Sequence, residues 1–159
     1  MFEIEHLKTS QHRMADFRAV SAEFFYESYH KNSTINLDHY EREIKGTFPY
    51  MNVDVPLVID TELDAVAGFA IVNYTMEFKD EPEGDLHRFY IHPNYRGTKA
   101  SRMLVEAVVK QFDAWGCVHS HVWAAPQLEG HENNLKLFKN IWMKYGYKET
   151  GIILTRERT

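Results

Sequence analysis

Hydrophobic and polar positions follow two different rhythms along the first part of the chain. Residues 2–7 alternate apolar and acidic side chains, which predicts a strand. Residues 12–29 place apolar side chains at every third or fourth position, which predicts a helix. A second helix is expected from about Asp38, capped by Asn36 or by Asp38 itself. Its apolar stripe consists of Leu37, Tyr40, Ile44 and Phe48.

Three strands separated by short turns are expected in the middle of the chain. Residues 56–60 form a short apolar segment, and the polar turn 61–64 leads into a longer strand that runs through Phe78. A second turn at residues 80–84 precedes the strand predicted for residues 85–91. Because short turns join antiparallel neighbours, we expect an antiparallel meander.

The spacing becomes helical again over residues 99–115, and Gly116 marks the end of that helix. Residues 117–123 are then predicted to form a strand. A strand, a helix and a second strand over residues 85–123 make one crossover connection, so we expect this pair of strands to be parallel.

The last segments are a helix over residues 132–145, ended by Gly146, and strand-like residues at 147–156. Together the elements predict a mixed α/β sheet with an antiparallel meander and one β-α-β crossover. The length of 159 residues suits one domain, so residues 1–159 are expected to form a single unit.

Composition narrows the class of protein. The formal net charge of −5 gives no long-range electrostatic attraction to nucleic acid or to an anionic membrane. The single cysteine, Cys117, excludes an internal disulfide and fits a reducing compartment. No apolar run approaches the roughly 20 residues that span a bilayer, and the N-terminus lacks the basic and apolar regions of a signal peptide. We therefore expect a cytoplasmic protein.

The segment 87–104 carries the strongest chemical signal. It combines a strand, a turn containing a proline, a short basic loop and the start of a helix. A loop that enters a helix leaves backbone N–H groups without partners at the positive end of the helix dipole, and such places bind phosphate. Gly97 permits close backbone approach, and Arg96, Lys99 and Arg102 add positive charge. The segment is therefore predicted to hold a pyrophosphate.

These residues resemble the signature of the GCN5-related N-acetyltransferases, the GNAT superfamily. That signature is Arg/Gln-x-x-Gly-x-Gly/Ala at the start of a helix. Here Arg96 occupies the first position, Lys99 replaces the first glycine and Ser101 the final Gly/Ala. A second resemblance lies in the last helix, where Trp142 stands at a position often taken by Tyr and Tyr145 precedes Gly146.

The resemblance implies a fold and a cosubstrate. In this family two parallel strands splay apart, and acetyl-CoA inserts between them. Its pantetheine arm pairs with strand backbone as an added strand would, and loop amides hold its pyrophosphate. Carried onto this chain, the coenzyme contacts are expected at Phe89, Tyr90, Ile91, Arg96, Gly97, Thr98, Lys99, Ala100 and Ser101.

The resemblance also implies an acetyl transfer in which an amine attacks the thioester directly. The amine must be neutral to attack, so a base has to remove its proton. Asp85 and His87 are the candidate bases, since alternate positions of a strand share a face. His119 on the neighbouring predicted strand is a third. Tyr145 is the candidate general acid for the leaving thiolate.

The histidines at 119 and 121 alternate along the predicted strand 117–123 and would point to one side, as two ligands of a metal would. His87 or His131 would have to supply a third ligand. No spacing identifies that ligand, so we expect no metal site.

The main alternative to an enzyme is a non-catalytic protein that binds CoA on the same scaffold, because Lys99, Ser101 and Trp142 depart from the family pattern. Strong nucleic-acid binding is disfavoured by the net charge. The acceptor is expected to be the amine of a small molecule or a protein that approaches residues 30–54, whose acidic and aromatic side chains would suit a cation. Members of the family often dimerise, so a homodimer is one possible state of this protein.

Overall fold

The computed structural model describes residues 1–28, 34–77, 80–122 and 132–151. Phe78, Trp123 and His131, which the sequence analysis names, lie outside these ranges. The chain divides into two compact units, Met1–Trp123 and Ala124–Thr159. The first unit contains the sheet and three of the α-helices, and the second contains the last helix.

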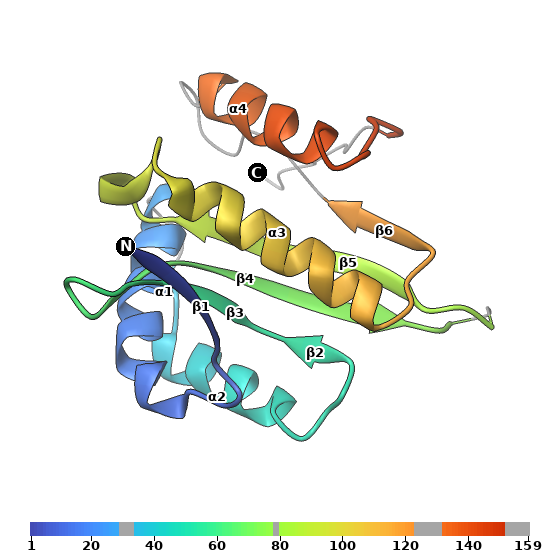
Figure 1. Cartoon of the computed structure of the whole chain (residues 1–159). Coiled ribbons are helices and arrows are strands. Elements are labelled where there is room, and N and C mark those ends of the chain that lie inside the picture. The colour runs from blue at the N-terminus through green and yellow to red at the C-terminus, as the bar shows by residue number, and fades with distance from the viewer. Residues whose placement is uncertain (29–33, 78–79, 123–131, 152–159) are drawn as a thin grey trace, which may run out of the picture. The chain divides into compact units, whose positions relative to one another are not determined.

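A six-stranded mixed sheet forms the centre of the first unit (Figure 1). Its strands lie in the order β1-β3-β4-β5-β6, with β2 paired to β4. All pairs are antiparallel except β5 and β6, which are parallel. The strands are β1 (Phe2–His6), β2 (Val53–Asp54), β3 (Pro56–Asp60), β4 (Ala65–Thr75), β5 (Glu83–Ile91) and β6 (His119–Val122). The predicted mixed α/β fold, with its meander and crossover, is confirmed.

Helices cover both faces of this sheet (Figure 1). On one face lie α1 (Met14–Ser28), preceded by the 3-10 turn η1 (Gln11–Arg13), and α2 (Leu37–Thr47). The amide of His39 donates to the side chain of Asn36, so Asn36 is the cap of α2. On the other face lies α3 (Lys99–Ala114), which follows the 3-10 turn η2 (Pro93–Tyr95).

The core beneath α1 and α2 is rich in aromatic side chains. Phe17 of α1 is fully buried, and its ring meets the ring of Phe69 on β4 edge-on, with centroids 5.1 Å apart. Tyr40 of α2 stacks on Phe17 and donates or accepts a hydrogen bond at Ser21. These contacts anchor both helices to the middle of the sheet.

The second unit contains α4 (Glu132–Met143), whose Trp142 ring contacts the rings of Phe138 and Tyr147. No strand forms over residues 147–151, and the remainder of the predicted strand at 147–156 lies outside the described residues. Within the described ranges, no helix is long and apolar enough to cross a membrane.

The hairpin between β4 and β5 differs from the sequence prediction. β4 is assigned only as far as Thr75, and β5 begins at Glu83 rather than residue 85, because Thr75 pairs with Glu83 and Tyr74 pairs with Gly84. Gly84 thus belongs to the strand, and α3 packs closely against it. A Cβ at this position would lie 2.5 Å from the ring of Phe112. A glycine is therefore needed here for close packing of α3 on β5, and not for a turn.

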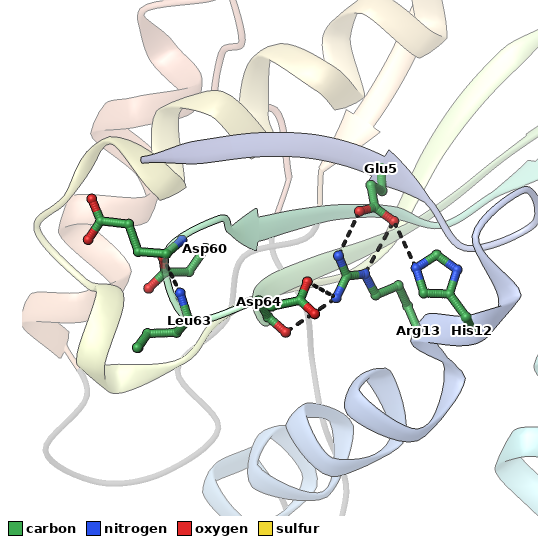
Figure 2. A network of polar contacts seen from close by, with 7 residues as sticks. Glu5, His12, Arg13, Asp60, Leu63 and Asp64 are labelled. Atoms are coloured by element: carbon green, nitrogen blue, oxygen red, sulfur yellow. Dashed lines mark hydrogen bonds and ion pairs between the residues drawn. The ribbon is translucent and has the colours of Figure 1, made fainter.

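A buried arginine ties the start of the chain to the β3–β4 turn (Figure 2). Arg13 is 7% exposed and donates to both carboxylate oxygens of Glu5 on β1, at 2.9 and 3.3 Å. Its guanidinium also lies 2.8 Å from the carboxylate of Asp64, a turn residue with φ of 51°. The hydrogen bond from Arg13, working against burial, holds the pKa of Glu5 below its usual value.

Replacing this arginine with an apolar side chain should destabilise the protein. Arg13→Met leaves the half-buried carboxylate of Glu5 without its partner, which should lower the free energy of unfolding by about 3 kcal/mol. Urea denaturation measures the change, with Arg42→Met on the exposed side of α2 as a control expected to stay within about 0.5 kcal/mol. Equal effects of the two substitutions would contradict the role assigned to Arg13.

Candidate active site

The central element of the site is β5, whose two edges are held differently. β4 pairs with β5 along its length, from Glu83 to Ile91. On the other edge, β6 pairs in parallel with Glu83 to Leu86, and β6 ends at Val122 opposite Leu86. The described pairing of β5 with β6 thus stops five residues before β5 ends. An extended ligand that binds by strand addition pairs with strand backbone next to the end of such a ladder.

A β-bulge at His87 changes which side chains of β5 face the same way. Along the β4–β5 register, Val72 pairs with Leu86 and Ile71 with Arg88, so His87 is the extra residue. Before the bulge, Gly84 faces Phe112 of α3. After it, Arg88 lies over the rings of Phe24 and Phe25 on α1, at 5.7 and 5.4 Å. In a regular strand residues 84 and 88 would share a face.

The bulge places His87 beside Asn73 of β4. Nε2 of His87 lies 2.5 Å from Oδ1 of Asn73, and Asn73 is also the cross-strand partner of Asp85. The two candidate bases therefore both lie next to Asn73. With the amide oxygen as the acceptor, Nε2 of His87 is the donor in this contact, and Nδ1 is the other ring nitrogen.

The predicted phosphate loop lies between the end of β5 and α3. Gly97 has a φ of +77°, a left-handed conformation that a side chain would strain. Thr98 caps α3, since its Oγ1 accepts from the amide of Ala100 at 3.2 Å. Within the described part of the chain, no hydrogen bond engages the amides of Gly97, Lys99 or Ser101. This loop therefore fits an anion at the positive end of α3.

The basic side chains of the loop point to different partners. Lys99 is exposed in the first turn of α3. Arg102 is also exposed and lies 3.6 Å from Glu106, one turn further along the helix. Arg96 is exposed as well, with 39% of its side chain accessible, but it bonds to the protein: Nε donates to the carbonyl oxygen of Ile91 at 3.0 Å and Nη2 to Glu27 of α1 at 2.7 Å.

Two residues of this region were missed by the sequence analysis, Asn73 and Glu27. The carboxylate of Glu27 also accepts from the phenol of Tyr90 at 2.6 Å. Burial, together with this hydrogen bond, raises the pKa of Tyr90, so the phenol keeps its proton. Both residues lie far along the chain from their partners, and neither has a sequence signal of its own.

Other candidate residues lie apart from this group. His119 is exposed and pairs with Glu83 at the start of β5, eight residues before Ile91. His121 contacts the carboxylate of Glu83, and the described residues contain no group of three side chains suited to a metal. Burial raises the pKa of the Cys117 thiol, with Asp113 and Asp85 adding to the effect, which disfavours the nucleophilic thiolate.

Tyr145 belongs to the second unit and follows α4. Its amide donates to the carbonyl oxygen of Trp142 at 2.9 Å. Its role as a general acid stays a prediction.

Comparison with known proteins agrees with this geometry. The sequence model of the Acetyltransferase (GNAT) family matches residues 14–140. The chain therefore belongs to this family. It is an acetyl-CoA-dependent N-acetyltransferase, and acetyl-CoA is its cosubstrate.

Solved structures with the same fold include acetyltransferases whose names give different acceptors. Glucosamine-6-phosphate N-acetyltransferase from Arabidopsis thaliana is 16% identical, with a TM-score of 0.73 over 99% of this chain and 98% of that chain. The aminoglycoside 6'-N-acetyltransferase AAC(6')-Ih from Acinetobacter baumannii is 14% identical, with a TM-score of 0.72 over 100% and 99%.

A third similar structure is a ribosomal-protein-alanine N-acetyltransferase from Brucella melitensis biovar Abortus 2308. It is 14% identical, with a TM-score of 0.71 over 99% of both chains. None of the curated proteins compared with this sequence matches it. At these identities the structures share the fold, and their different names leave the acceptor unspecified.

β4 lies very close to the end of β5 at Gly68, where there is no room for a side chain. A Cβ at Gly68 would lie 2.5 Å from the carbonyl oxygen of Tyr90 and 2.7 Å from Cδ1 of Ile91. Gly68→Ala should therefore push these strands apart and lower the free energy of unfolding by about 2 kcal/mol.

Urea denaturation provides the measurement. The control is Gly46→Ala, since a Cβ there meets nothing within 4 Å. On α2 this change should stabilise the protein by about 0.5–1 kcal/mol. A neutral or stabilising Gly68→Ala would show that the contact between β4 and β5 is not tight.

Proposed function

We propose that this protein transfers the acetyl group of acetyl-CoA by direct attack of an acceptor amine, at the end of β5. The acceptor is the amine of a small molecule or of a protein. The observation that carries the proposal is the placement of the α3 N-terminus directly after a strand whose described pairing with β6 ends at Leu86.

The coenzyme would bind along two adjacent features. The backbone of Phe89, Tyr90 and Ile91 lies beyond the last described β5–β6 pair, where an extended pantetheine arm would run alongside β5. The amides around Gly97 and Ser101 would hold the pyrophosphate, with Lys99 adding a positive charge. Thr98 keeps the first turn of α3 in place by its cap.

For the chemical step, we assign the role of general base to His87. Its Nδ1 is the basic nitrogen, because the contact with Asn73 keeps the proton on Nε2. His87 is exposed, so an acceptor amine can reach it directly or through one water. Asp85 shares the neighbour Asn73 and would attract a cationic amine before its proton is removed.

A backbone N–H at the end of β5 would stabilise the oxyanion that forms when the amine attacks the thioester. Tyr145 is kept as the candidate that donates a proton to the departing thiolate. In the non-catalytic alternative the contact of His87 with Asn73 would be structural only, and the match to an acetyltransferase family supports the enzyme instead.

Calorimetric titration tests the coenzyme site. Acetyl-CoA and the unreactive desulfo-CoA should both bind with micromolar affinity, and Lys99→Ala should weaken binding about threefold to fivefold by removing one charge near the phosphates. Lys110→Ala, an exposed lysine further along α3, is the matched control and should bind like the wild type. Binding that is unchanged in Lys99→Ala would place the phosphates elsewhere.

Release of CoA in the presence of polyamine, amino-sugar, aminoglycoside and peptide amines tests the base. With an accepted amine, His87→Gln should lower kcat/KM by about 10²–10⁴-fold. Asp85→Asn should lower it less, and His12→Gln, far from β5 at the start of the chain, should have no effect. If Asp85→Asn caused the larger loss, the base would be Asp85 instead.

A further inference from the structure

The carboxylate of Glu27 joins three segments that lie far apart in the sequence. Glu27 stands in the last turn of α1, and its side chain is 23% exposed. Oε1 accepts from the phenol of Tyr90 at 2.6 Å, and Oε2 accepts from Nη2 of Arg96 at 2.7 Å. Both carboxylate oxygens therefore accept a hydrogen bond, one from Tyr90 near the end of β5 and one from Arg96 in the loop that follows.

Arg96 is held by the protein on three sides. Besides the bond to Glu27, its Nε donates to the carbonyl oxygen of Ile91 at 3.0 Å. Its guanidinium carbon lies 5.4 Å from the centre of the Tyr90 ring, within the range of a cation–π contact. The side chain thus spans from the end of β5 to the end of α1 and closes the loop of residues 92–96 on itself.

We infer that Glu27 is a positioning residue for the coenzyme, holding Arg96 as a strut that fixes the backbone of the phosphate loop. This inference rests on the proposed function. In this arrangement Arg96 does not contact the phosphates through its side chain. The carboxylate of Glu27 also neutralises the charge of Arg96, so binding of the pyrophosphate depends on the loop amides, the helix terminus and Lys99.

The physical reason for the strut is the geometry of the loop. Gly97, directly after Arg96, takes up the left-handed conformation that turns the chain into α3. Its neighbours on both sides have extended backbone, with ψ of 143° at Arg96 and −179° at Thr98. Because glycine has more backbone freedom to lose than other residues, fixing this loop beforehand reduces the entropy that phosphate binding would cost.

Opposite outcomes separate the strut from a direct phosphate ligand. As a strut, Glu27→Gln should weaken acetyl-CoA binding about fivefold to tenfold in calorimetric titration, because the loop loses its charged anchor. If Arg96 were a phosphate ligand restrained by Glu27, the same substitution would free the guanidinium and leave affinity equal or higher. Glu23→Gln, an exposed carboxylate one turn earlier on α1, is the matched control and should bind like the wild type.

A double-mutant cycle strengthens the test. Arg96→Ala should lose at least as much affinity as Glu27→Gln, since it also removes the bond to Ile91 and the contact with Tyr90. The combined Glu27→Gln/Arg96→Ala variant should lose no more than Arg96→Ala, because Glu27 acts through Arg96. S-acetylpantetheine, which lacks the pyrophosphate, should have an unchanged KM in all three variants, whereas the KM for acetyl-CoA should rise. General damage to the fold would raise both KM values. Additive losses across the cycle would overturn the strut.

The outcomes for this inference and for the proposed function are distinct. Wild-type protein that binds no acetyl-CoA would overturn the proposed function and this inference together. Wild-type protein that binds acetyl-CoA, with Glu27→Gln binding equally well or better, would overturn the strut alone. Should Glu27→Gln fail to fold, Glu27→Asp takes its place, because the shorter side chain draws the carboxylate away from Arg96. Weaker binding of acetyl-CoA then supports the strut, and equal or tighter binding overturns it.

Discussion

The candidate site depends on one constraint, the unequal pairing of the two edges of β5. β4 holds the strand from Glu83 to Ile91, whereas the described ladder with β6 stops at Leu86. The chain leaves β5 through a short loop and enters α3 at Lys99. A strand edge and the positive end of a helix are consequently neighbours, and these are the two kinds of backbone group that an extended thioester with a pyrophosphate requires.

Close packing at two glycines keeps β5 in this position, from the face covered by α3 and from the neighbouring strand β4. Gly84 lets the ring of Phe112 approach from α3, and Gly68 lets β4 approach the carbonyl group of Tyr90. The bulge at His87 lies between these two contacts. It turns Arg88 and Tyr90 toward α1 while the earlier part of the strand faces α3. Backbone geometry, and not side-chain chemistry alone, therefore decides which residues face an acceptor.

Arginines serve mainly as internal connections in this protein. Arg13 links β1 to the β3–β4 turn, Arg88 lies over aromatic rings of α1, and Arg96 links the end of β5 to Glu27. Each guanidinium can satisfy several acceptors at once, which suits a residue that joins separate elements. At the start of α3, Lys99 and the helix terminus carry positive charge, whereas the charge of Arg96 is paired with the carboxylate of Glu27.

The sequence by itself determined the element order, the mixed sheet and the loop before α3, because these depend on local periodicity, turn residues and a contiguous motif. Residues 56–60 and the helix from residue 99 lie where the pattern predicts them. Only the tertiary structure decided the bulge at His87, the partnership of His87 with Asn73, and the contacts of Glu27 with Tyr90 and Arg96. These features arise from pairing between segments 14 to 69 positions apart. No local pattern encodes such pairing, since it depends on strand register and on how α1 packs against the sheet.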